Sequence, residues 1–598
     1  MRLILKKIVV ILLLLPGGVL PVLAQKKGTA VPHRKGAMEQ KKIIIYQLLP
    51  RLFGNKNSHN IPYGTIEQNG SGKFADLDNK ALEGIKELGT THVWYTGVIA
   101  HASLTDYSKY GILPDDADVV KGRAGSPYAI RDYYDVDPDL AQHTGQRMAE
   151  FEALVERTHQ KSMKVLIDFV PNHVARHYHS GVKPQGVVDF GVYDDVRKAF
   201  SAANDFYYIP GKALVVPPDA DKISNPLSPL KDQLYLENPA KATGNNVFSE
   251  RPKADDWYET VKLNYGVDYL DGEKKYFSPL PPVWTKMRAI LLYWADKGVD
   301  GFRCDMAEMV PVEFWEWVIP EVKKKYPGLI FIGEAYNPKA YEIYFTKGKF
   351  DYLYDKVGLY DGLKKLIRNE PSATVEDIKS AWKTGSAGYD DRMLRFLENH
   401  DEERIASAGF AGRAELALPA MVLSATLGKG PVMLYFGQES GEPGKGKEGF
   451  GGDDNRTTIF DYWGVPEHQK WMNNGAFDGA LLSPEQMTLR KFYQKLLRLA
   501  GESAAVGAGK IYEVPVSGTM NNRMYAFIRY TEQQRLLVLL NFDREQNFTA
   551  DINIPAELSG KGIASPLREL LSDQEWNTTS PTSIPVNLKP VSAQIIAF

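Results

Sequence analysis

Short apolar runs alternate with amphipathic segments along most of the chain. Eight runs have the length and composition of buried strands, and these are Ile43–Leu49, Thr91–Thr96, Lys164–Val170, Gly301–Met306, Leu329–Glu334, Asp351–Asp355, Met393–Leu397 and Pro431–Phe436. Segments with helical spacing separate many of them, including Ala81–Leu88, Met148–His159, Val283–Lys297 and Phe314–Tyr326. Strands that alternate with helices indicate a parallel sheet, so the pattern predicts an α/β fold with a closed (β/α)8 barrel of the TIM type.

Two regions depart from this alternation. Residues 174–278 are rich in Pro, Gly, Asn, Asp and Tyr and have no long helical period, so we expect a small inserted domain after the third strand. From residue 505 onward, short strand-like runs lie between turn residues, which predicts a C-terminal antiparallel β-sandwich over 505–598. The barrel is then predicted over 43–173 and 279–504.

The N-terminus has the pattern of an export signal. A basic start precedes the apolar run Ile8–Leu15, and Ala24 offers a small residue at a cleavage site. The run is too short to span a bilayer comfortably, although an uncleaved anchor is the alternative. We predict a signal peptide over 1–24 and a polar linker over 25–42. The protein would then be periplasmic or secreted, with no stable membrane span after signal removal.

Composition narrows the classes of function. The chain has 598 residues, of which 43% are hydrophobic and 24% charged, as in ordinary globular proteins. A formal charge of −2 gives no broad electrostatic footprint for nucleic acid, and none is expected as a partner. The single cysteine, Cys304, excludes an intrachain disulfide and a cysteine-based zinc cluster. The alternation of side chains along the strand predicts that Cys304 is buried. The sequence leaves the oligomeric state open.

Carboxylates follow four of the predicted barrel strands. Asp168 lies in the third strand, Asp305 in the fourth, Glu334 ends the fifth, and Asp401 follows the seventh. The carboxyl ends of barrel strands meet at one rim, where this fold carries its chemistry. A single such residue could be a helix cap, but four at matching positions indicate a catalytic centre. Hydrolysis of a glycosidic bond requires two carboxylates, one as nucleophile and one as proton donor.

Four short segments in this order resemble the signature motifs of the α-amylase family of glycoside hydrolases. They are DFVPNH (168–173), GFRCDMAEM (301–309), FIGEAY (331–336) and FLENHD (396–401). The predicted barrel, inserted domain and C-terminal sandwich also follow the family plan, so the resemblance covers about residues 43–598. It implies a retaining enzyme that acts on α-glucosidic bonds.

The resemblance also implies roles for the residues of these motifs. Asp305 matches the nucleophile, Glu334 the general acid/base, and Asp401 a third acid that holds sugar hydroxyls. Arg303 would keep Asp305 ionised, and Asp168 matches a structural carboxylate near that arginine.

Three further residues are expected to contact the reacting sugar. His173 and His400 match histidines that hydrogen-bond the sugar, and Tyr128 resembles a tyrosine that stacks on it. Packing in the core is the alternative for Tyr128.

Two positions depart from the family pattern. The second motif usually ends in Lys-His, but here it ends in Glu308 and Met309, so the acceptor subsites should differ. The inserted domain usually supplies a calcium-binding aspartate, and the best match here is Lys262, which cannot bind a cation. Asn172 is the retained candidate metal ligand. We therefore doubt that calcium binds at the usual family site and expect the Lys262 ammonium group there, a surface lysine being the alternative.

Other cofactors are not expected. The asparagine-rich stretch at 55–60 could hold calcium instead, but it contains no carboxylate, and a polar loop is the favoured interpretation. No organic cofactor is predicted.

Taken with the resemblance, these features predict an exported retaining hydrolase with an α-glucan substrate. It would cleave α-1,4-glucosidic bonds of starch or maltooligosaccharides through a covalent glycosyl-enzyme. The alternatives are a neopullulanase- or cyclodextrinase-like hydrolase, a transglycosylase and, more remotely, a non-catalytic glucan-binding barrel. The presence of all three acids argues against the last of these.

Overall fold

The computed structural model describes residues 41–598 except 218–229, 451, 517–521, 561 and 564. The predicted signal peptide and most of the predicted linker lie outside the described residues. No helix in the described part of the chain is both long enough and apolar enough to cross a membrane.

Eight parallel strands form the predicted barrel. In chain order they are β1 (Ile44–Leu48), β2 (His92–Tyr95), β5 (Lys164–Phe169), β12 (Gly301–Cys304), β13 (Ile330–Gly333), β14 (Tyr352–Tyr354), β15 (Met393–Leu394) and β16 (Val432–Tyr435). Their order in the sheet is β15-β14-β13-β12-β5-β2-β1-β16. A parallel bridge between Arg395 and Val432 joins the two outer strands and closes the barrel. The predicted fold class is confirmed.

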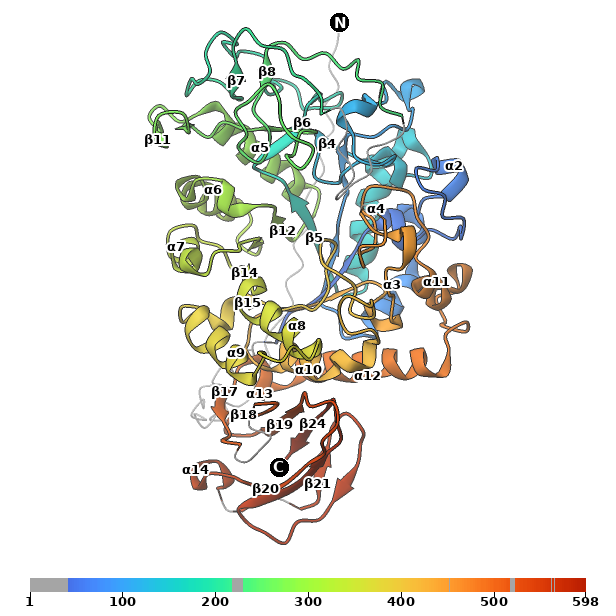
Figure 1. Ribbon diagram of the computed structural model, residues 1–598, viewed down its shortest axis with the longest axis vertical. Helices are drawn as coiled ribbons and strands as arrows, with labels where there is room; N and C mark the ends of the chain where they lie inside the picture. The colour runs from blue at the N-terminus through green and yellow to red at the C-terminus, as the bar shows by residue number, and fades with distance from the viewer. Residues whose placement is uncertain (1–40, 218–229, 451, 517–521, 561, 564) are drawn as a thin grey trace, which may run out of the picture. The chain divides into compact units, whose positions relative to one another are not determined.

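Both faces of the barrel sheet are covered, which explains its continuous apolar runs. Every residue of β1, β2, β12 and β16 is buried. In this fold, side chains on one face of the sheet fill the interior and those on the other pack against the surrounding helices. Figure 1 shows helices around the strands. The longest of these helices is α12 (Pro484–Glu502), where Ser483 and Gln486 form a capping box and Leu489, Tyr493 and Leu496 are buried on one face.

The helices that the sequence predicts are present. They are α3 (Asn79–Lys86), α4 (Arg147–Gln160), α5 (Pro282–Asp296) and α6 (Val312–Lys325). Further helices of the barrel region are α7 (Tyr341–Thr346), α8 (Asp361–Ile367), α9 (Val375–Ser380), α10 (Leu418–Thr426) and α11 (Pro466–Met472).

Between β5 and α5 the chain forms three small antiparallel sheets and, among the described residues, no helix. The sheets pair β6 (His173–Ala175) with β9 (Thr260–Lys262), β7 (Tyr208–Ile209) with β8 (Ala240–Lys241), and β10 (Val267–Asp268) with β11 (Lys274–Lys275). The β6–β9 pairing sets His173 opposite Lys262. The end of the insertion therefore returns to the carboxyl end of the barrel strand from which it leaves.

A hairpin that the sequence analysis does not predict follows β2. Its strands are β3 (Ile99–His101) and β4 (Ile130–Val136), and their register shifts twice. The long connection between them, residues 102–129, carries Tyr128 to the barrel mouth.

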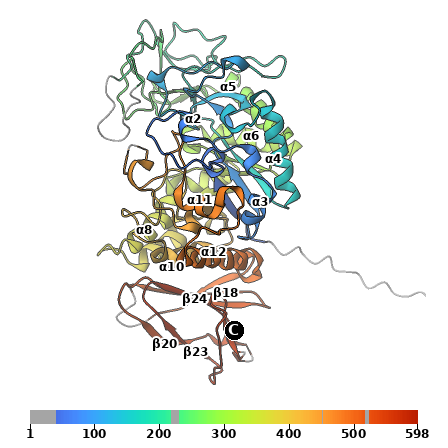
Figure 2. The same ribbon diagram turned by 90° about the vertical axis from the view of Figure 1, so that its right-hand side faces the viewer.

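The C-terminal region consists of two antiparallel sheets. The larger contains β17 (Lys510–Glu513), β18 (Met524–Tyr530), β19 (Arg535–Asn541), β24 (Ser592–Ala597), β21 (Leu567–Glu569) and β22 (Glu575–Trp576), and the smaller pairs β20 (Phe548–Asn553) with β23 (Ser583–Leu588). The two sheets share one apolar cluster that includes Leu539 and Ile552. Helix α10 packs against β19 and β24, as Figure 2 shows. A single helical turn, α14 (Ala556–Ser559), interrupts the expected run of strands.

Candidate active site

One guanidinium group lies between the two acids to which the sequence analysis assigns the chemistry. Nη1 of Arg303 is 2.8 Å from Oδ1 of Asp305, and Nη2 is 2.7 Å from Oε1 of Glu334. β12 and β13 are neighbouring parallel strands in which Cys304 pairs with Gly333, so the next residue on each strand is one of these acids. The strand register thus brings Asp305 and Glu334 together around a fully buried arginine.

The predicted structural carboxylate, Asp168, contacts the same nitrogen of Arg303 as Asp305 does. Oδ1 of Asp168 is 3.4 Å from Arg303 Nη1. Asp168 also accepts hydrogen bonds from Trp94 Nε1 at 3.0 Å and from the Tyr128 hydroxyl at 3.3 Å. Burial raises the pKa of Asp168, and the charge of Arg303 opposes that rise.

The third acid is held by a histidine. Nε2 of His400 is 3.0 Å from Oδ2 of Asp401. The Gln47 side-chain amide donates to His400 Nδ1 at 2.8 Å, which places the imidazole proton on Nε2, facing Asp401. The ring of Tyr128 stacks on His400 with a centroid separation of 5.1 Å.

The two carboxylates at the cavity floor differ in their electrostatic environment. Burial raises the pKa of Asp305 well above its usual range, and the negative charges of Glu334, Asp168 and Asp401 add to this, while Arg303 opposes it. Burial also disfavours the charge of Asp401, but the charge and hydrogen bond of His400, together with the charges of Arg303 and Arg456, outweigh it and lower the pKa of Asp401 to about 2.

Five of the predicted residues line a single cavity at the barrel mouth. It is bounded by Tyr128, His173, Asp305, Glu334 and Asp401, together with Lys121, Ser126, Trp257, Glu259, Thr260, Met306, Tyr336, Ile459 and Phe460. Arg303, His400 and Asp168 lie behind this wall and contact the residues that form it. His173 packs edge-on against Trp257 at 5.4 Å between ring centroids, and burial lowers the pKa of His173 to about 3.

Several cavity residues do not appear in the sequence analysis. Tyr336 stands two residues after Glu334 and donates to its Oε1 at 2.6 Å, and the Met306 amide donates to the other oxygen at 2.7 Å. The position of Tyr336 next to a motif acid is a signal that sequence reasoning could have used. No sequence motif contains three other cavity residues, Lys121, Glu259 and Phe460. They come together only in the folded chain.

Lys262 and Asn172 also come together. The buried Nζ of Lys262 donates to the Asn172 side-chain oxygen and, at 2.9 Å, to the carbonyl oxygen of Met309. Burial lowers the pKa of Lys262 to about 7. Both oxygens that the family motif would offer to calcium already accept hydrogen bonds from an amine. The residues present at this position do not fit a divalent cation.

The asparagine-rich stretch has its oxygens engaged by the backbone. Asn55 Oδ1 accepts from the Asn57 amide at 3.0 Å, Asn57 Oδ1 from His59 at 2.8 Å, and Asn60 Oδ1 from Gly464 at 2.7 Å. These contacts are those of a polar loop.

Cys304 is fully buried, and burial raises the pKa of its thiol well above the usual range. A thiol in this state is a poor nucleophile. Glu308, the other departure from the motif, accepts hydrogen bonds from the backbone amides of Tyr336 and Asn337 at 2.7 and 3.0 Å.

A closed barrel with paired carboxylates at the carboxyl ends of adjacent strands defines an enzyme of the glycoside hydrolase class. A family model for the alpha amylase catalytic domain matches residues 47–473, more than half of the chain. The protein therefore belongs to the α-amylase family of glycoside hydrolases.

Relatives and solved structures agree with this assignment. The chain is 22% identical to alpha-amylase 3 of Dictyoglomus thermophilum, over 73% of this chain and 77% of that protein. It is also 22% identical to neopullulanase 2 of Thermoactinomyces vulgaris, over 87% of this chain and 72% of that protein. An alpha-amylase from Geobacillus thermoleovorans, solved with acarbose, has the same fold with a TM-score of 0.60 at 20% identity, over 94% of this chain and 99% of that one.

Proposed function

We propose that the protein is an exported retaining hydrolase that cleaves α-1,4-glucosidic bonds of starch or maltooligosaccharides. The observation that carries the proposal is the contact of one buried guanidinium group with both Asp305 and Glu334. Two carboxylates that contact the same guanidinium group lie at neighbouring strand ends, and close carboxylates suit a covalent rather than a direct displacement.

In the first step the Asp305 carboxylate attacks the anomeric carbon and the bond to the leaving oxygen breaks. Glu334 gives its proton to that oxygen, so the leaving chain departs as an alcohol and a glycosyl-Asp305 ester remains. In the second step Glu334 takes a proton from water, whose oxygen attacks the anomeric carbon and releases Asp305. Asp401, oriented by His400, binds sugar hydroxyls as positive charge develops on the ring.

A slow-release fluorinated glucosyl substrate tests the mechanism. Mass spectrometry should find one added sugar on the peptide that contains Asp305, and proton NMR should find the α-anomer as the first product. Asp305→Asn should retain its melting temperature and lose turnover by several orders of magnitude. The matched control is Asp551→Asn, an exposed carboxylate on β20 that should behave as wild type. A labelled peptide without Asp305, or inversion, contradicts the proposal.

A second candidate is a neopullulanase- or cyclodextrinase-like hydrolase or a transglycosylase. The long match to neopullulanase 2 favours it, as does Glu308 at a motif position that usually has lysine. Product analysis on amylose, pullulan and cyclodextrins separates the candidates, and products longer than the substrate identify transfer. A non-catalytic glucan-binding barrel would release no phenol from an aryl maltooligoside.

Export is the remaining part of the proposal, and it rests on the basic start and apolar run of residues 1–24. Expression of the full chain in a bacterium with a periplasm tests it. The protein should be recovered from the periplasm or medium with its N-terminus near residue 25. Full-length protein retained in the cytoplasm contradicts export without affecting the enzymatic proposal.

A further inference from the structure

An ion pair stands at one end of the catalytic cavity. Nζ of Lys121 is 2.6 Å from Oε1 of Glu259, and both residues line the cavity. Glu259 is buried, and its second oxygen, Oε2, has no hydrogen-bond partner. The Lys121 side chain retains 21% exposure. An ammonium group has three N–H donors, so Lys121 keeps donors free for a ligand after it has bound Glu259.

The pair joins segments that are distant in sequence. Lys121 belongs to the connection between β3 and β4, and Glu259 to the insertion immediately before β9. The Lys121 Nζ also lies 5.7 Å from the centre of the Phe460 ring, which belongs to the segment after β16. A side chain at the neighbouring Gly122 would come within 2.3 Å of the Phe460 carbonyl oxygen, so a glycine is required for this close approach.

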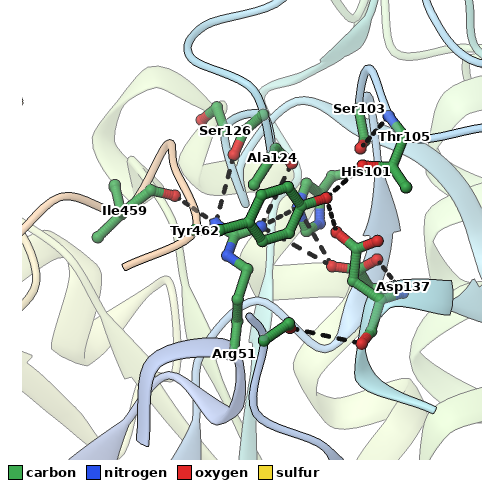
Figure 3. A network of polar contacts seen from close by, with 12 residues as sticks. Arg51, His101, Ser103, Thr105, Ala124, Ser126, Asp137, Ile459 and Tyr462 are labelled. Atoms are coloured by element: carbon green, nitrogen blue, oxygen red, sulfur yellow. Dashed lines mark hydrogen bonds and ion pairs between the residues drawn. The ribbon is translucent and has the colours of Figure 1, made fainter. Parts of the chain in front are cut away.

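The buried side chain of Arg51 joins two of the segments that form this end of the cavity. Figure 3 shows the guanidinium of Arg51 reaching the carbonyl oxygens of Ala124 and Ile459, at 3.3 and 2.5 Å. The Phe460 carbonyl in turn accepts from the amides of Ala124 and Gly125, at 2.9 and 3.1 Å. The segments that carry Lys121 and Phe460 are thus fixed to one another and to the end of β1.

The order of the strands indicates which end of the substrate meets the cavity wall formed by Lys121, Glu259 and Phe460. Glu334 and Tyr336 follow β13. In the closed barrel two strands separate β13 from β2 on one side, and two separate it from β16 on the other. The connections that carry Lys121 and Phe460 therefore leave the barrel from strands across its mouth from β13, and Glu259 meets them from the insertion. Since the general acid protonates the leaving oxygen, we infer that this wall faces the glycone part of the substrate.

We propose that Lys121, held by Glu259, binds hydroxyl groups of the glucosyl unit at the non-reducing end, so that the enzyme acts on chain ends. The inference rests on the proposed α-glucan hydrolase activity and specifies its substrate as the non-reducing ends of maltooligosaccharides. Hydrogen bonds from a charged donor are the stronger kind. A wall of Lys121, Glu259 and Phe460 offers free donors on Lys121 and a free acceptor on Glu259, which suit the additional free hydroxyl of a terminal sugar.

Two aryl maltoheptaosides test the inference, one with a free non-reducing end and one with that end blocked by a 4,6-ethylidene group. Wild type should cleave the free substrate at least about tenfold faster, at a fixed distance from its non-reducing end. Lys121→Ala and Glu259→Gln should each lower kcat/KM for the free substrate by about tenfold and reduce the preference over the blocked one. Lys121→Arg should retain the preference.

The control variant is Lys109→Ala, an exposed lysine in the same connection that does not line the cavity. It should match wild type on both substrates, and melting temperatures report folding for every variant. Equal cleavage of both substrates at internal bonds by wild type overturns the inference and leaves the hydrolase proposal standing. Failure to cleave either substrate, or starch, overturns both.

Discussion

The hydroxyl group of Tyr336 donates a 2.6 Å hydrogen bond to Oε1 of Glu334. The backbone amide of the same tyrosine is held by the carboxylate of Glu308 at 2.7 Å. Glu308, which departs from the family motif, therefore fixes the loop that brings a phenol to the general acid. The departure from Lys at this position places a carboxylate where it supports the loop next to the acid.

Replacing Tyr336 with Phe should lower kcat/KM by about tenfold or more. The tyrosine hydroxyl holds the Glu334 carboxyl in place, and a hydrogen bond to a charged group contributes about 1.5–3 kcal/mol. Glu308→Ala should give part of the same loss because it frees the loop that carries Tyr336. Steady-state kinetics measure the loss, and melting temperatures report folding. An unchanged kcat/KM in Tyr336→Phe would contradict this role of the tyrosine.

Glu334→Gln should separate substrates by their leaving groups. A glutamine cannot supply a proton, so hydrolysis of maltooligosaccharides should fall by about 10²–10⁴-fold, the usual contribution of general acid catalysis. A glycosyl fluoride or dinitrophenyl glycoside should still form the covalent intermediate, because its leaving group needs little protonation. Pre-steady-state release of fluoride or phenol measures this step. Equal losses on both kinds of substrate would remove Glu334 as the acid.

The acid limb of the profile should lie above the ordinary range for an aspartate. Burial raises the pKa of Asp305, and the nucleophile must be ionised to attack. Activity should thus be lost as pH falls through this raised pKa, and not only near the usual value of about 3.9. The charge of Arg303 opposes this rise. Arg303→Lys loses the guanidinium contact with both Asp305 and Glu334, so it should move the acid limb to higher pH. A wild-type limb at or below pH 4 contradicts this account.

Chelators should scarcely change the melting temperature or the activity of the wild type. The Lys262 amine already satisfies Asn172 and the Met309 carbonyl, and each buried acceptor left unmet costs about 1–3 kcal/mol. Lys262→Met should therefore lower the melting temperature. Lys262→Asp restores the carboxylate of the family motif, and added calcium should stabilise that variant but not the wild type. Inactivation of the wild type by chelator, reversed by calcium, would contradict the prediction.

The sequence was sufficient to predict the barrel and the positions of its acids, for one physical reason. A strand covered on both faces, such as Ile330–Gly333, is a continuous apolar run, and the polar residue that follows it marks the rim. Asp305 and Glu334 are each the first residue after such a strand. Their adjacency then follows from strand register alone.

The rest of the site depends on contacts that no local pattern records. The partners Lys121 and Glu259 meet only because the insertion folds back through β9. The segment Ile130–Val136 is a strand although it contains three charged residues, since Arg131 and Asp135 find ion-pair partners elsewhere in the fold. Propensity and periodicity carry no information on such partners, so the hairpin and the cavity wall could not be predicted from the sequence.

The barrel is closed by its shortest strand. β15 contributes two residues, and the Arg395–Val432 bridge completes the seam, where the buried Arg395 pairs with Asp355 at 3.2 Å. We expect the barrel to open first at a joint with so few backbone hydrogen bonds. Amide hydrogen exchange would detect this local opening. Asp401 lies six residues beyond Arg395, at the end of the same segment. Heating should therefore uncouple Asp401 from Asp305 and Glu334 before the barrel unfolds, and thermal inactivation would precede loss of secondary structure.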